Sequence, residues 1–173
     1  MPSRIVNISS SLYTVTKFFN TSIEKMNDED YYNTVLQYGR TKAIVMLLSS
    51  ELDRRLRAKG VNYLYAKLYV NTNDPGAVKT QPYYTHINKG SIMDKLISLI
   101  FVSVDEGALT HLYLATSPEV EEQSIHGEYY TPIAKRGKAS SSYTKSEKEA
   151  KKAWSTVEKL IKEKVPDYSG AGI

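Results

Sequence analysis

The sequence predicts an α/β fold built on a parallel sheet, on the basis of three observations. Short apolar runs at residues 4–11, 61–72 and 127–134 have the length and composition of strands. Amphipathic helical patterns separate these runs. Strands that alternate with helices favour a parallel sheet, because each connecting helix returns the chain to the same end of the sheet.

The first predicted strand begins near the N-terminus and ends in three serines, Ser9, Ser10 and Ser11. A polar segment at residues 14–33 follows, and we expect it to cross the surface.

The longest predicted helix runs from Val35 to Lys59. Asn33 or Thr34 can cap its start, and Gly60 ends it. Apolar side chains recur every four residues along it, which predicts one buried stripe. These residues are Ile44, Leu48, Leu52 and Leu56.

The second predicted strand, residues 61–72, alternates apolar and polar side chains and ends at the turn sequence Asp74-Pro75-Gly76. We expect residues 77–89 to form a loop. Residues 91–104 are typical of a short buried helix, or of a helix followed by an extended piece.

A third helix is predicted from Glu106 to Thr116, with Ser103 or Asp105 as its cap. The third predicted strand, residues 127–134, comes next.

The C-terminal region is predicted as a polar linker at residues 136–142 and a helix that ends near Lys164. Thr144 and Glu147 have the spacing of a capping box for this helix. We expect residues 166–173 to be a disordered tail.

Composition limits the function classes. The 173 residues, 41% hydrophobic, suit one domain with one core. The chain has no cysteine, which excludes disulfides, thiolate metal sites and a cysteine nucleophile, and agrees with a cytoplasmic location. The histidines His86, His111 and His126 lack a metal-ligand spacing, so no metal site is predicted.

Charge and hydropathy limit the partners. The net charge of +4 comes largely from lysines near the C-terminus, which we interpret as a solvated helix face and not as a nucleic-acid surface. No apolar run is long enough for a transmembrane helix, and no signal-peptide pattern is present.

Tyr38 and Lys42 are the first candidates for chemistry. Residues four apart share one face of a helix, so the phenol and the ammonium should be neighbours. A nearby cation favours the ionised form of a phenol, which helps it to exchange protons near neutral pH. A half-buried tyrosine beside a solvated lysine is the alternative interpretation.

The polar residues after the first two strands share one predicted location. The serines follow the first strand, and Pro75-Gly76 follows the second. Carboxyl ends of parallel strands meet at the ligand-binding edge of an open α/β sheet. Tyr38 lies near the start of the connecting helix, on the same side.

These features together resemble the C-terminal half of a short-chain dehydrogenase/reductase. The resemblance rests on the Ser-Ser strand end, on Tyr-x-x-x-Lys, on Pro-Gly followed by Val78 and Thr80, and on the stretches 106–118 and 127–132. The last two resemble the fungal light-induced alcohol dehydrogenase and retinol-dehydrogenase-like branch. The resemblance covers nearly all of the chain and implies a partial Rossmann-like, doubly wound parallel sheet.

The resemblance implies a role for each matching residue. Tyr38 would be the acid or base at the substrate oxygen, Lys42 would assist it and bind the nicotinamide ribose of NAD or NADP, and Ser10 would steady the substrate. Ser9 or Ser11 takes that role if the register differs by one. Residues around the nicotinamide would be Pro75, Gly76, Val78 and Thr80. Asp74 stands where the family often has histidine, and we expect it to take no catalytic role.

The chain departs from the family in what its sequence lacks. No Thr-Gly-x-x-x-Gly-x-Gly turn for the pyrophosphate and no Asn-Asn-Ala-Gly segment occurs, and Asn7 lies inside a strand. The resemblance therefore predicts a single C-terminal catalytic portion, residues 1–173, without the N-terminal dinucleotide-binding half.

Two function hypotheses follow from the resemblance. The first is the catalytic part of an oxidoreductase that interconverts an alcohol and a carbonyl compound, inactive alone. The second is a non-catalytic remnant that forms homo-oligomers or pairs with a full-length relative, either through an exposed strand edge at residues 5–8 or through the helix from Tyr38 to Lys59. A substrate pocket at Pro82 to Ile97 is suggested by apolar side chains, although simple packing explains them as well: Tyr83, Tyr84, Ile92 and Met93.

Overall fold

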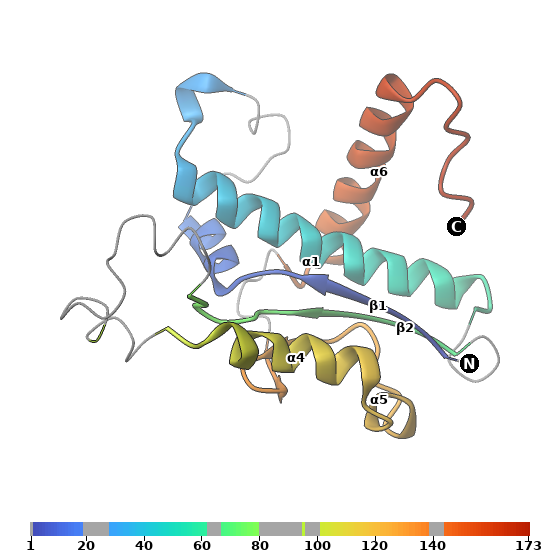
Figure 1. The fold of residues 1–173 in the computed structure, drawn as a ribbon. Coiled ribbons are helices and arrows are strands. Elements are labelled where there is room, and N and C mark those ends of the chain that lie inside the picture. The colour runs from blue at the N-terminus through green and yellow to red at the C-terminus, as the bar shows by residue number, and fades with distance from the viewer. Residues whose placement is uncertain (1, 19–27, 62–66, 80–94, 96–100, 139–143) are drawn as a thin grey trace.

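Helices cover both faces of a four-stranded sheet (Figure 1). The computed structural model describes residues 2–18, 28–61, 67–79, 95, 101–138 and 144–173. The strands are β1 (Ser3–Ile8), β2 (Leu68–Asn73), β3 (Tyr129–Thr131) and β4 (Lys135–Arg136). The α-helices are α1 (Thr34–Ala58), α4 (Val104–Thr116), α5 (Glu119–Glu122) and α6 (Glu147–Lys164), and the 3-10 helices are η1 (Ser11–Phe18) and η3 (Glu29–Tyr31).

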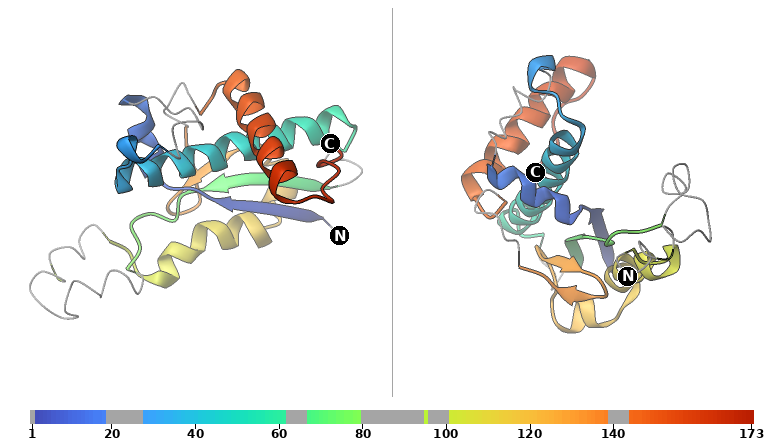
Figure 2. Two further views of the ribbon diagram at one scale, coloured as in Figure 1. Left: turned by 90° about the horizontal axis from the view of Figure 1, so that it is seen from above. Right: turned by 90° about the vertical axis from the view of Figure 1, so that its left-hand side faces the viewer.

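The strands lie in the order β1-β2-β3-β4. β1, β2 and β3 are parallel, and β4 pairs with β3 in the antiparallel direction. Helix α1 lies on one face and α4 on the other, while α6 crosses over α1 (Figures 1 and 2). The predicted α/β fold with a parallel sheet is therefore confirmed.

The position of each strand in the sheet explains its burial. β2 has strands on both sides and helices on both faces, so every residue from Tyr69 to Asn73 is buried. β1 is an edge strand, and its residues are half-buried or exposed. The predicted second strand, residues 61–72, overlaps β2 at residues 68–72, while residues 62–66 lie outside the described part of the chain.

Helix α1 has the predicted boundaries to within one residue. The Asn33 side chain accepts hydrogen bonds from the backbone N–H groups of Val35 and Leu36, both at 3.1 Å. Gly60 follows the helix with a φ of +74°, a conformation that glycine adopts without steric cost.

The buried face of α1 is displaced from the predicted stripe. Ile44, Leu48, Leu52 and Leu56 are only half-buried. The helix instead buries Ala43, Leu47 and Glu51. The physical reason is that α1 is covered twice, by the sheet and by α6.

Glu51 shows how α1 buries a charge. Its carboxylate accepts hydrogen bonds from Arg54 Nε at 2.7 Å and from Arg55 Nε at 2.7 Å. The hydrogen bond from Arg54 lowers the pKa of Glu51 although burial opposes this. The Arg55 guanidinium also lies 4.7 Å from the ring centroid of Trp154 on α6. Arg55 thus pairs with Glu51 within α1 and makes a cation–π contact with α6.

Several local predictions have definite outcomes. Ser103 caps α4 in a full capping box with Glu106, which decides between the two predicted caps. The cap of α6 is Ser146, whose hydroxyl accepts from the N–H of Glu149; the predicted cap, Thr144, is buried instead. The predicted linker at 136–142 begins with strand residue Arg136 of β4.

The C-terminal segment contacts α1 and α6, where the sequence predicts disorder. The carbonyl oxygen of Ile173 accepts a hydrogen bond from Arg55 Nη1 at 3.0 Å, and that of Gly172 accepts one from Lys59 Nζ at 2.7 Å. The N–H of Ala171 donates to Glu158 Oε1 at 3.0 Å. Charged groups on the two helices thus satisfy the backbone of this segment.

Neither a membrane-crossing helix nor a metal-binding group is found where the structure describes the chain. No described helix is both long and apolar enough to cross a bilayer. No cluster of three acidic or histidine side chains suited to a metal ion occurs among the described residues.

Leu47→Ala tests the double cover of α1. Leu47 is 0% exposed and packs with Ala150 and Ala153 of α6. We expect the free energy of unfolding, measured by urea denaturation, to fall by about 2–5 kcal/mol because the substitution leaves a cavity. The matched control is Leu112→Ala at an exposed leucine of α4, which should change the free energy of unfolding by less than about 0.5 kcal/mol. Equal effects would show that α6 does not pack on α1.

Candidate functional site

The first turns of α1 bring a phenol and an ammonium to the carboxyl end of β1. Lys42 Nζ donates a hydrogen bond to the carbonyl oxygen of Ile8 at 3.1 Å, and it lies 5.5 Å from the ring centroid of Tyr38. Tyr38 is 44% exposed, and its hydroxyl has no hydrogen-bond partner among the described residues. The phenol is therefore open to a ligand, beside a cation whose position is held by the strand end.

The three serines after β1 have different environments. Ser9 is buried: its hydroxyl donates to the carbonyl oxygen of Lys42 at 2.9 Å, and its N–H donates to that of Asn73 at 2.7 Å. Ser10 is half-buried, and its oxygen accepts the N–H of Leu12 at 3.3 Å. Ser11 is exposed. Ser9 thus connects β1 to α1, while the Ser10 hydroxyl keeps its proton available to an acceptor.

The loop after β2 holds the residues predicted to face a cofactor. Gly76 has a φ of +83°, and a Cβ there would lie 2.9 Å from Cγ of Pro132. Val78 forms a parallel bridge with Val102. Gly107 of α4 packs closely against the side chain of Val78, and a Cβ at position 107 would lie 2.5 Å from Val78 Cγ2. Pro75, Gly76 and Val78 are therefore in a closely packed loop.

Some predicted site residues cannot be placed. Thr80 lies outside the described residues. So does most of the predicted substrate pocket, including Tyr83, Tyr84, Ile92 and Met93.

Asp74 joins the two loops at this edge of the sheet. Its Oδ2 accepts the N–H of Ser11 at 3.1 Å, and its Oδ1 accepts the N–H of Gly76 at 2.9 Å. The sequence signal for one of these bonds was present, because aspartate often accepts the N–H two residues ahead in a turn. The bond to Ser11 spans 63 residues and has no local signal.

A pair of buried tyrosines lies near Asp74. Tyr13 of η1 and Tyr129 of β3 pack edge to face, with ring centroids 5.6 Å apart. Burial raises the pKa of the Tyr129 hydroxyl above its ordinary value, and the negative charge of Asp74 raises it further. Tyr129 is therefore a protonated packing residue near neutral pH.

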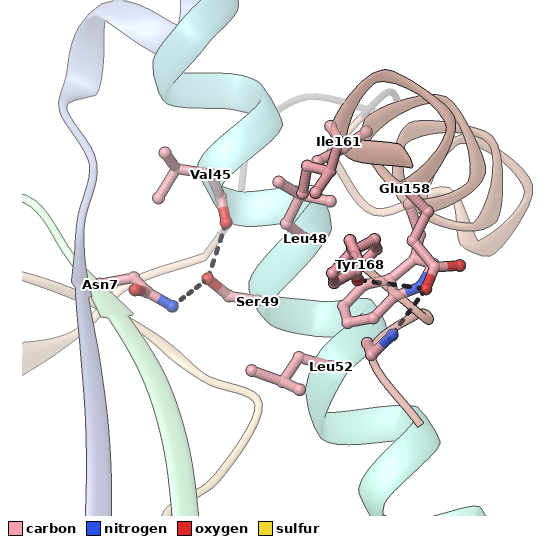
Figure 3. A pocket seen from close by; sticks show the side chains of 11 residues that line it. Asn7, Val45, Leu48, Ser49, Leu52, Glu158, Ile161 and Tyr168 are labelled. Atoms are coloured by element: carbon pink, nitrogen blue, oxygen red, sulfur yellow. Dashed lines mark hydrogen bonds between the residues drawn. The ribbon is translucent and has the colours of Figure 1, made fainter. Parts of the chain in front are cut away.

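A second feature is a cavity of about 240 Å³ on the β1 side of α1 (Figure 3). At its base, Asn7 Nδ2 donates to Ser49 Oγ at 2.8 Å, and Ser49 Oγ donates to the carbonyl oxygen of Val45 at 2.6 Å. Helix α6 and the C-terminal segment form the opposite wall. The lining residues are Asn7, Val45, Leu48, Ser49, Leu52, Trp154, Val157, Glu158, Ile161, Tyr168 and Ala171.

Comparison with known proteins identifies relatives by sequence. The chain is 37% identical to human "Retinol dehydrogenase 14" over 133 residues, which cover 75% of this chain and 36% of that protein. It is 31% identical to "Short-chain dehydrogenase TIC 32 B, chloroplastic" of Brassica napus over 129 residues, which cover 74% of this chain and 38% of that protein. The chain thus spans less than two fifths of the length of these curated relatives. No protein-family model matches it.

A solved structure supports the fold alone. The crystal structure of an uncharacterized protein from Mycobacterium paratuberculosis superposes with a TM-score of 0.61 at 23% sequence identity. The superposition covers 93% of this chain and 51% of that protein.

Alanine substitutions of Ser9 and Ser10 should separate their roles. Ser9→Ala removes a buried hydrogen bond, so we expect the free energy of unfolding to fall by about 1 kcal/mol. Ser10→Ala should change it by less than about 0.5 kcal/mol, because the hydroxyl is only half-buried. Urea denaturation measures both values. A larger loss for Ser10 than for Ser9 would assign the structural role to Ser10.

Proposed function

This chain belongs to the short-chain dehydrogenase/reductase family, and we propose that it is the catalytic portion of an NAD(P)-dependent oxidoreductase that interconverts an alcohol and a carbonyl compound. The observation that carries the proposal is the arrangement at the carboxyl end of β1. The Lys42 ammonium is held by the Ile8 carbonyl beside the exposed phenol of Tyr38.

The proposed roles follow from the chemistry of each group. In reduction, a hydride adds to the carbonyl carbon and the Tyr38 hydroxyl gives its proton to the carbonyl oxygen; oxidation is the reverse. The charge of Lys42 stabilises negative charge on the phenol oxygen. The Ser10 hydroxyl donates a hydrogen bond to the substrate oxygen, where charge develops.

The described residues fit the nicotinamide end of a dinucleotide. The Lys42 ammonium has three donors, and the Ile8 carbonyl uses one, so others can reach ribose hydroxyls. Pro75, Gly76 and Val78 would face the ring, with Thr80 as the fourth predicted contact. A bound nicotinamide would supply or accept the hydride. Both NAD and NADP are compatible with these residues.

The pyrophosphate end has no matching motif in this sequence. Such a group is bound by a Gly-rich turn at a helix N-terminus, which the 173 residues lack. We therefore propose that this chain needs a Gly-rich nucleotide-binding portion for activity.

Tyr38→Phe tests the proposed chemistry. The experiment uses a fusion in which the Gly-rich portion of a family member precedes Pro2, assayed with NADPH and a panel of ketones and aldehydes. We expect kcat/KM to fall by at least about 100-fold, because phenylalanine cannot give the proton. Tyr32→Phe, at an exposed tyrosine before α1, is the matched control and should retain activity.

Two outcomes would contradict the proposal. One is a Tyr38→Phe fusion as active as the parent. The other is saturable micromolar binding of NADPH by the 173-residue chain alone, measured by fluorescence titration, which would show that no further portion is needed for the cofactor.

A second candidate function is a non-catalytic module that binds a full-length relative. The observation that favours it is the free edge of β1, which pairs only with β2 among the described strands. The cavity of Figure 3 adjoins this edge and offers apolar side chains of α1 and α6. A strand added to β1 could place an adjoining apolar side chain in the cavity.

Ile8→Lys tests this second candidate. Ile8 is 45% exposed at the end of the free strand, and a lysine there would oppose strand addition. We expect at least about 10-fold weaker association with a purified full-length family member, measured by sedimentation velocity. Ile133→Lys is the matched control, since Ile133 is 46% exposed away from β1. If both variants associate as the parent does, β1 is not the interface.

A further inference from the structure

We propose that Asp74 is a positioning residue, which holds the Ser10 loop and the Pro75-Gly76 loop at a set separation. This inference rests on the proposed function for its catalytic meaning, because those two loops carry the groups assigned to substrate and cofactor. The sequence suggested no catalytic role for Asp74, and the structure shows contacts that a residue in an ordinary turn would not make.

The carboxylate of Asp74 divides its two oxygens between the loops. Oδ1 accepts the N–H of Gly76, two residues ahead, at 2.9 Å. Oδ2 accepts the N–H of Ser11, from the other loop, at 3.1 Å. The planar carboxylate of Asp74 therefore fixes the separation between the backbone N–H groups of Ser11 and Gly76.

The backbone of Asp74 is itself anchored to the sheet. Its N–H donates to the carbonyl oxygen of Tyr130 in β3 at 2.8 Å. The neighbouring Asn73 carbonyl accepts the N–H of Ser9 at 2.7 Å, which joins the end of β2 to the end of β1. Because the sheet holds its backbone, the carboxylate is a rigid reference point for both loops.

The burial of Asp74 means that an acidic side chain at this position needs hydrogen bonds to compensate for its charge. Asp74 is only 4% exposed, and it forms no salt bridge with any side chain that the structure describes. A buried charge is costly unless hydrogen bonds compensate, and charge-assisted bonds from backbone N–H groups do so. An asparagine at position 74 would accept a hydrogen bond from only one of the two N–H groups, Ser11 or Gly76. Its NH₂ group would face the other N–H and cannot accept a hydrogen bond.

The expected consequence concerns geometry at the reacting atoms. Ser10 immediately precedes Ser11, and Pro75 immediately precedes Gly76. If one loop shifts against the other, the serine hydroxyl moves relative to the nicotinamide face, and small misplacements of reacting groups slow a reaction strongly. Asp74 itself touches neither substrate nor cofactor in this proposal.

The test combines three substitutions in the 173-residue chain. Asp74→Ala removes both bonds, and Asp74→Asn keeps one. Asp74→Ser can keep the short-range bond to Gly76, since serine forms a similar turn, but cannot reach Ser11. Asp53→Asn is the matched control, because Asp53 is equally buried but contacts Arg57 and His126.

Amide hydrogen exchange by NMR is the direct readout. Rates at Ser11 and Gly76 are divided by the rate at Leu47 in the same sample, which corrects for global stability. We expect a rise of about 10-fold or more at both amides in Asp74→Ala, and at Ser11 alone in Asp74→Ser. Asp53→Asn should leave both ratios unchanged. Unchanged ratios in Asp74→Ser and Asp74→Asn would overturn the proposal, even if Asp74→Ala did not fold.

Activity gives a second, separable readout in the fusion with a Gly-rich portion. We expect kcat to fall by about 10-fold or more in Asp74→Ser while KM for NADPH changes less. Lost exchange protection with unchanged kcat would overturn the positioning role. A parent fusion without activity would contradict the proposed function, while the exchange ratios would still decide whether Asp74 holds the two loops.

Discussion

The parallel pairing of β1 with β2 is the constraint on which the rest of the structure depends. Six residues of each strand pair in register, from Ser3 with Leu68 to Ile8 with Asn73. Parallel neighbours need a crossover, and α1 provides it by packing on one face of the sheet. Both strands then end at the same edge, where Ser9 and Asp74 begin the two site loops.

Helix α1 is fixed to β1 in its first half and packs against α6 in its second half. Near its start, Lys42 contacts the last carbonyl of β1, and the Ser9 hydroxyl contacts the carbonyl of Lys42, so helix and strand hold each other. Farther along, Glu51 is buried with two arginines beneath α6. Removing one partner from such a group leaves an unpaired buried charge, which is strongly destabilising.

The edge strand β1 takes part in both of the candidate functions that we propose. The same strand positions the Lys42 ammonium through the Ile8 carbonyl and presents an unpaired outer side next to the cavity of Figure 3. This chain spans less than two fifths of the length of the matched curated relatives.

The sequence by itself determined the α/β fold class, the limits of α1 and the residues of the Tyr38–Lys42 pair, because helix periodicity, caps and turn residues are local signals. Family resemblance added Ser10 and Pro75-Gly76 as candidates. Only the tertiary structure decided that Ala43, Leu47 and Glu51 face inward, since that depends on residues distant in sequence: Ala43 packs with Tyr13 and Tyr129, and Leu47 packs with α6. It also decided the contact between Asp74 and Ser11, because no periodicity or motif specifies a hydrogen bond across 63 residues.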